Sequence, residues 1–150
     1  MINTKRGYNM RAFIDSLLDF NLQATWKRPA VMLLKDKDSV VDSISLLEEK
    51  AGDTHQVFFA KEIEVDSIAS FFTLANGLIL AGQQVTIVFD SISAITPFLT
   101  ELQSWTNDRF SMTPSEVQEK GRLILLINNE QKESLPAITS SIFGLQYVAE

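Results

Sequence analysis

The side chains best suited to chemistry are carboxylates that directly follow apolar runs of the chain. Asp36 and Asp38 come just after the run 30–34, and Asp90 follows the run 85–89. If these runs are strands of an open α/β sheet, their carboxyl ends form the crevice where ligands bind. Carboxylate oxygens hold Mg²⁺, which in turn orients phosphates. The three aspartates are therefore a candidate acidic pocket, suited to a domain that responds to a nucleotide or to phosphate.

Other segments of the chain would line such a crevice as well. In a sheet of parallel strands, the residues after each strand gather at one edge. With the strands expected below, these segments are 35–39, 61–64, 90–93 and 128–131, together with Glu150.

Outside the acidic pocket, composition excludes most catalytic chemistry. The chain has no cysteine, which removes disulfides, thiolate zinc sites and thiol nucleophiles. Its one histidine, His55, stands at the start of an expected strand, where a solvated boundary residue is typical, and no Ser-His-Asp arrangement is credible around it. We expect no catalytic residue, no metal site and no cofactor, and hence a protein that is not an enzyme.

Three aromatic residues are candidates for contact with a partner. Trp26 and Trp105 are expected near helix ends, and Phe110 lies in 107–121, the most polar stretch of the chain. Lone aromatic residues of this kind belong to the core or its rim more often than to a ligand site, but an exposed one is a typical interface anchor. We therefore take all three as candidate interaction residues, with core packing as the alternative.

Alternating helix and strand patterns must position these residues. Apolar residues recur at helical spacing in some segments and form short continuous runs in others, with Asp, Ser, Thr, Pro and Gly at the expected ends. The expected elements are a helix over 10–22, a strand over 30–34, a helix from 38 or 39 to 52, a strand over 56–60, a helix over 66–82, a strand over 85–89, a helix from 96 through 105, a short helix opening at 113, a strand over 122–127, a helix over 134–143 and a strand over 145–148.

This succession predicts the fold class. Strands that alternate with helices, each strand a near-continuous apolar run, imply right-handed crossovers and a mostly parallel sheet covered on both faces. The length, 150 residues, is that of one domain, and no repeat or linker divides the chain. We predict a single α/β domain over 1–150, a three-layer sandwich with five strands and helices on both faces.

Two of the strands resemble those of RecA-like and AAA+ ATPases. The run 85–90 is similar to a Walker B strand, which delivers an aspartate to magnesium, and 125–129 is similar to the sensor strand of that class. Such enzymes need a glycine-rich loop after the first strand, because glycine lets several N–H groups turn toward phosphate. Segment 35–39 has no glycine, and Ser91 stands where a glutamate would polarise water. The resemblance implies a RecA-like domain that lacks a P-loop, a pseudo-ATPase.

A second resemblance is to the receiver domains of response regulators. Those domains have an acidic magnesium pocket, and here Asp90 would be the phosphoacceptor beside Asp36 and Asp38. The family also carries Ser or Thr after its fourth strand and Lys after its fifth, where this chain has Asn128 and the pair 149–150, Ala-Glu. Without that lysine the phosphoryl oxygens have no cation, which argues against a working receiver.

The two resemblances differ in strand order, and the sequence leaves both orders open. A receiver-like order makes strands 30–34 and 85–89 neighbours and brings the three aspartates together, whereas a RecA-like order inserts strand 122–127 between them. A third similarity, of 89–93 to the Asp-Ser of STAS-type anti-sigma antagonists, ranks below these because such domains have fewer leading strand-helix units.

The layout as a whole resembles P-loop-lacking RecA-like domains that bind other proteins. One such family is the SulA family of bacterial cell-division inhibitors, whose chains are of similar length. The similar features are a leading Leu-rich helix with Leu17 and Leu18, Trp26 before the strand at 31–34, the helix end Ala51-Gly52, the helix end Ala81-Gly82 and the strand 85–89. The C-terminal extension of this chain is longer than is usual in that family.

The other family is the N-terminal domain of the cellulose-biosynthesis protein BcsE. The similar segments are 38–47, 102–105, 126–128 and 142–145. The cyclic-dinucleotide site of BcsE lies in a separate domain with an Arg-x-x-Asp motif, which this sequence lacks. Both families imply a non-enzymatic domain that docks onto a protein partner and controls assembly of a polymer or a secretion complex.

Charge supports a protein partner. The chain carries 13 Lys and Arg against 19 Asp and Glu, a formal net charge of −6, so it lacks the excess of positive charge that nucleic acids and membrane surfaces attract. The basic residues near the N-terminus are not followed by an apolar run, so we expect no signal peptide, no spanning helix and a cytoplasmic protein. Association into a homodimer is compatible with this composition.

Overall fold

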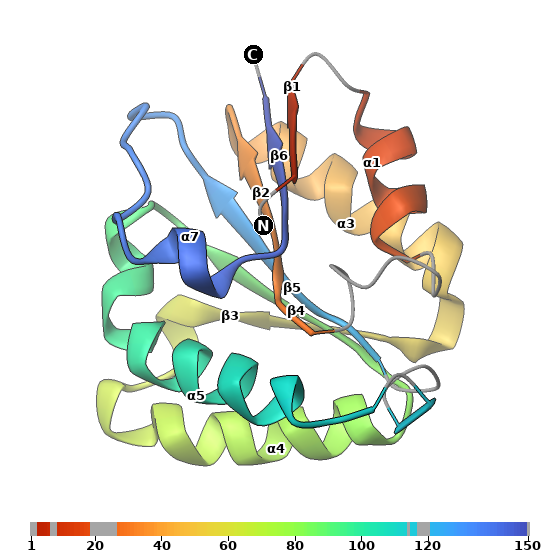
Figure 1. Cartoon of the computed structure of the whole chain (residues 1–150). Coiled ribbons are helices and arrows are strands. Elements are labelled where there is room, and N and C mark those ends of the chain that lie inside the picture. The colour runs from red at the N-terminus through yellow and green to blue at the C-terminus, as the bar shows by residue number, and fades with distance from the viewer. Residues whose placement is uncertain (1–2, 7–8, 19–26, 114, 117–120, 150) are drawn as a thin grey trace.

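The structure is a computed structural model, and it describes residues 3–6, 9–18, 27–113, 115–116 and 121–149. Its elements follow the predicted alternation (Figure 1). The strands are β1 (Asn3–Arg6), β2 (Ala30–Leu34), β3 (His55–Phe59), β4 (Gln84–Phe89), β5 (Leu123–Asn128) and β6 (Leu145–Val148). The α-helices are α1 (Met10–Leu17), α3 (Lys37–Ala51), α4 (Ile68–Leu80), α5 (Leu99–Phe110) and α7 (Thr139–Ile142), and the 3₁₀ helices are η1 (Gly52–Thr54), η2 (Ala60–Glu62), η3 (Val65–Ser67) and η4 (Ser93–Phe98).

The six strands form one sheet in the order β1-β6-β2-β5-β4-β3, and every neighbouring pair is parallel. Ile127 of β5 is opposite Leu33 of β2 on one side and Phe89 of β4 on the other. This is the RecA-like alternative, with β5 between β2 and β4. The receiver-like order is wrong for this chain.

Helices cover both faces of the sheet, so the predicted three-layer α/β sandwich is confirmed. Helices α1 and α3 lie on one face and α4, α5 and α7 on the other (Figure 1). Along β2, Val31 and Leu33 face the cluster under α4 and α5, whereas Met32 faces the cluster under α1 and α3. Because successive side chains of a strand point to opposite faces, a strand buried on both faces has to be apolar throughout.

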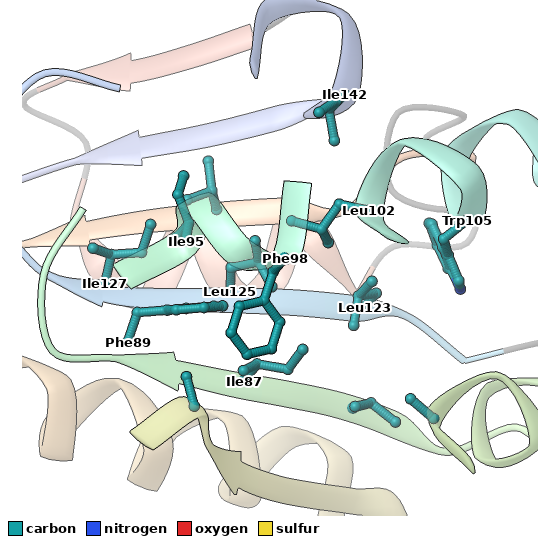
Figure 2. Packing of buried hydrophobic residues seen from close by; sticks show 14 of the residues in the cluster. Ile87, Phe89, Ile95, Phe98, Leu102, Trp105, Leu123, Leu125, Ile127 and Ile142 are labelled. Atoms are coloured by element: carbon teal, nitrogen blue, oxygen red, sulfur yellow. The ribbon is translucent and has the colours of Figure 1, made fainter. Parts of the chain in front are cut away.

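The larger core cluster packs between the sheet and the helices α4 and α5. Figure 2 shows Phe98 and Leu102 over the side chains of β4 and β5. The rings of Phe89 and Phe98 meet edge to face, with centroids 5.1 Å apart and planes at 87°. Edge-to-face contact is the favoured arrangement of two aromatic quadrupoles, so it fixes how η4 sits on the sheet.

Three predicted features differ from the observed elements. The sheet has a sixth strand, β1, whose sequence Asn-Thr-Lys-Arg shows no apolar run. The helix predicted over 134–143 is reduced to α7, since Pro136 has no N–H to donate and disfavours helix in the residue before it. The helix predicted from Thr96 and Pro97 begins as η4 and becomes α-helical only at Leu99.

The start of β5 depends on a glycine in close contact with the chain before β4. The Gly121 N–H donates to the carbonyl of Ile79 at 2.8 Å. A Cβ on Gly121 would lie 1.6 Å from the carbonyl oxygen of Gln83, a backbone atom that cannot move aside. No other residue type fits this position without displacing β4 or β5.

We expect Gly121→Ala to lower the free energy of unfolding by about 3 kcal/mol or more, because overpacking against a rigid neighbour is costly. Gly77→Ala is the matched control. A Cβ at Gly77, inside α4, meets nothing within 4 Å. The free energy of unfolding of this variant should therefore rise by about 0.5–1 kcal/mol, because alanine has a better helix propensity than glycine. Urea denaturation of both variants measures the difference, and a Gly121→Ala protein as stable as the wild type would contradict the contact.

Candidate functional site

A pocket of about 550 Å³ opens at the carboxyl ends of β3, β4 and β5, beside the first turns of α3. Its polar lining consists of Lys37, Lys61, Asp90, Asn128 and Glu130. All five lie in segments that the sequence predicts to line the crevice of the sheet. The crevice is therefore where the topology of an open parallel sheet requires it to be.

The rim of this pocket is apolar, which the sequence does not indicate. Val41 of α3 and Phe59 at the end of β3 both line the pocket, and their side chains are 60% and 39% exposed. Phe59 follows the predicted core pattern of its strand, so nothing in its sequence position separates it from a buried residue. The site joins exposed apolar surface to two ammonium groups and two carboxylates.

The N-terminus of α3 is closed by the chain itself. Asp36 precedes the helix in an extended conformation, and its carboxylate accepts a hydrogen bond from the Ser39 N–H at 2.8 Å. That hydrogen bond, with a second contribution from the Ser39 side chain, lowers the pKa of Asp36. The cap is Asp36 rather than the predicted Asp38 or Ser39, and Asp38 lies in the first turn. A carboxylate thus occupies the end of the helix where a P-loop would receive phosphate.

The structure does not bring the three candidate aspartates together, so the predicted acidic pocket of Asp36, Asp38 and Asp90 is wrong. Asp36 and Asp38 follow β2, Asp90 follows β4, and β5 lies between these strands. Only Asp90 lines the pocket. Among the residues that the structure describes, no group of three or more His, Cys, Asp or Glu side chains is placed to hold a metal ion.

The polar residues at and just after the end of β5 hydrogen-bond within their own turn, at the position of the sensor residue in the RecA-like resemblance. The Asn128 side chain is 9% exposed, and its Oδ1 accepts from the Glu130 N–H at 3.2 Å. The Asn129 Oδ1 accepts from the Glu133 N–H at 2.9 Å, and its Nδ2 donates to the Glu133 carbonyl at 3.3 Å. These side chains stabilise the loop that leads to α7.

Trp105 belongs to the core. Its side chain is only 6% exposed, it lies within α5 rather than at a helix end, and Figure 2 shows it beside Leu102 and Leu123 of the larger cluster. The guanidinium of the buried Arg109 lies 4.5 Å from the centre of its ring. Burial lowers the pKa of Arg109 to about 10, so it stays charged at neutral pH. For Trp105 the structure therefore shows core packing, which was the alternative to an interaction residue.

Phe110 is exposed, as an interface anchor has to be. It is 45% exposed at the end of α5, with the Arg28 guanidinium 4.9 Å and the Lys27 ammonium 5.8 Å from the centre of its ring. We call these three residues the Phe110 patch. No sequence pattern predicts it, because Lys27 and Arg28 precede β2 while Phe110 is the last residue of α5. The third candidate, Trp26, lies outside the described residues.

Comparison with known proteins adds no family: no family model, no curated protein and no solved structure matches this chain. In the part of the chain that the structure describes, no helix has the length and apolar character needed to cross a membrane.

The Asp36 cap predicts a pH-dependent contribution to stability. Asp36→Ala removes the acceptor for the Ser39 N–H, so it should destabilise α3 and the fold at neutral pH. Because the pKa of Asp36 is lowered from its ordinary 3.8, the contribution is fully present above that value and is lost as the pH falls through the pKa of the folded state. Asp42→Ala, on an exposed part of α3, is the control. Denaturation at pH 7 and at pH 2–3 tests this, and an Asp36→Ala deficit that persists unchanged at low pH would argue against the cap.

Proposed function

We propose that this protein is a non-enzymatic protein-interaction or regulatory domain with a RecA-like fold, an inhibitor or assembly factor acting on a polymer-forming or secretion-complex protein. The observation that carries the proposal is the closed N-terminus of α3, where Asp36 holds the Ser39 N–H. Cell-division inhibition of the SulA kind and control of cellulose secretion of the BcsE kind are the two activities that the sequence resemblances favour.

The physical reason to propose a non-enzymatic domain is that segment 35–39 lacks the geometry that binds phosphate in a P-loop. A P-loop aims several backbone N–H groups at phosphate and needs glycine to do so. Segment 35–39 offers no glycine, and a phosphate at this end of α3 would have to displace the Asp36 carboxylate and would meet its negative charge. An α/β sandwich without that loop keeps its surfaces but lacks the means to hold a triphosphate for hydrolysis.

The Phe110 patch supports a protein partner and indicates its charge. The patch joins an exposed aromatic ring to a guanidinium, and aromatic residues and arginine are both enriched at protein interfaces. On a chain with a net charge of −6, this local positive charge is complementary to an acidic segment of the partner. We propose the patch as the part of the surface that contacts the partner.

One observation favours a second candidate function, a nucleotide- or phosphate-responsive domain. Asp90 lines the same pocket as Lys37 and Lys61, whose ammonium groups would attract a phosphate. In this alternative Asp90 acts without Asp36 and Asp38. The pocket carries as many carboxylates as ammonium groups in its lining, which is why we rank this function second.

Ligand-induced stabilisation separates the two functions. A ligand that binds the native state raises its melting temperature, so Mg-ATP, Mg-GTP and acetyl phosphate should leave the Tm of the wild type unchanged under the proposed function. Asp90→Asn should then behave as the wild type does with every ligand. A rise in Tm that disappears in Asp90→Asn would replace the proposed function with the alternative.

The Phe110 patch is tested on the partner recovered by affinity capture with the full chain. We expect Phe110→Ser to weaken binding of that purified partner by roughly tenfold or more, since truncating a central aromatic anchor removes much of the binding energy. Leu74→Ser is the matched control, because Leu74 is 55% exposed on α4. Equal affinities of the two variants for the partner, measured by titration calorimetry, would contradict the proposal that the Phe110 patch contacts the partner.

A further inference from the structure

The strand β3 is an edge of the sheet. It is last in the strand order, and among the described residues it pairs only with β4 (Figure 1). An edge strand presents unpaired backbone N–H and C=O groups along its free side, which makes it a template for another strand.

Within β3, three of the usual devices that prevent pairing are missing: proline, charged side chains and a β-bulge. Within β3 there is no proline and no Asp, Glu, Lys or Arg. Its register with β4 is continuous from His55 opposite Gln84 to Phe59 opposite Val88, so no bulge turns the edge away. Four of its five residues are half-buried, and Phe59 is exposed. Natural proteins block edges with charges, proline or bulges, and an edge without them is open to a partner strand.

The charges that flank β3 select the orientation of such a partner. Asp53 stands in η1 at the amino end of the strand, and Lys61 and Glu62 stand in η2 at its carboxyl end, all exposed. If two copies pair in antiparallel orientation about Val57, the Asp53 end of each copy meets the Lys61 end of the other. With Val57 on the axis, the position opposite Asp53 is that of Lys61, whereas Glu62 is opposite the uncharged Gly52. A parallel pairing would place aspartate against aspartate and lysine against lysine. Opposite charges across a strand pair attract, and like charges repel.

We propose that two copies of this chain associate through their β3 edges, antiparallel and with the two-fold axis at Val57, so that one continuous sheet runs through both. A two-fold axis makes the interface self-complementary, and both Asp53–Lys61 contacts form at once. His55 of each copy then faces Phe59 of the other, which covers the exposed ring. Exposed ion pairs contribute little affinity, so backbone hydrogen bonds and burial of Phe59 hold the pair while the charges set its orientation.

This dimer does not depend on the proposed function. It uses neither the Phe110 patch nor a bound nucleotide, and its failure would leave the proposed partner contact unaffected. Conversely, a chain that binds no partner at the Phe110 patch could still pair at β3. The two proposals are therefore tested by different variants.

The axis position predicts a specific cross-link. Two residues directly opposite each other in an antiparallel pair have Cα atoms about 4.5 or 5.5 Å apart, which is within the range that a disulfide spans. Because the natural chain has no cysteine, Val57→Cys introduces one thiol per copy. We expect mild oxidation to convert it to a reducible covalent dimer roughly ten times faster than Ser70→Cys, an exposed control on α4. Equal rates of disulfide formation in the two variants would overturn the proposed two-fold axis at Val57.

The flanking charges give a second, independent test. Sedimentation velocity should show a dimer for the wild type and a roughly tenfold weaker dimer for Asp53→Lys and for Lys61→Asp. When these two variants are mixed in equal amounts, the affinity of dimerisation should return, because both pairs of opposite charges are restored in the mixed dimer. Circular dichroism checks that both variants fold. A wild type that sediments as a monomer at the concentration used for cross-linking, or a mixture no tighter than the single variants, would overturn the proposal.

Discussion

Burial of β5 on both of its faces is the constraint on which the rest of this structure depends. All six of its residues are buried, between β2 on one side and β4 on the other. Its first five residues, 123–127, are accordingly apolar, since unpaired polar side chains are costly in the interior, and the polar Asn128 stands at its carboxyl end. Polar residues can therefore serve a function only where the strands end, and β5 decides which of those ends are neighbours. It separates Asp36 and Asp38 from Asp90 and makes the crevice a place where lysine, asparagine and carboxylate side chains meet instead.

The same edge of the sheet shows that a parallel sheet with this strand order forms without a glycine-rich loop after β2. The amino end of α3 still offers its N–H groups, but Asp36 satisfies the one from Ser39 within the chain. Nothing in the packing of β2 against β5 requires a glycine loop after β2. The arrangement of strands is therefore a weaker guide to activity than the few residues that follow them.

Sequence patterns predicted most of this fold and less of its site. Apolar runs located β2, β4 and β5 because each is buried on both faces, and turn residues bounded α3 and α4. The polar strand β1 carried no such signal, because pairing with β6 rather than burial pattern defines it. Strand order was left open, since it depends on contacts between segments about a hundred residues apart. For the same reason the contact of Arg28 with Phe110 could not be predicted. The exposure of Phe59 could not be predicted either, because the periodicity of a sequence does not show which strand lies at the edge of the sheet.

The strand order also determines how the chain can fold. Strands β3 and β4 are neighbours joined by α4, so this unit can form from one continuous segment. The central strand β2 has its partners, β5 and β6, about ninety and more residues further along the chain. Contacts of long sequence separation carry a high loop-closure entropy and slow folding. Because β5 and β6 are the last strands in the sequence, β2 can pair with its neighbours in the sheet only after the chain through β5 has been synthesised.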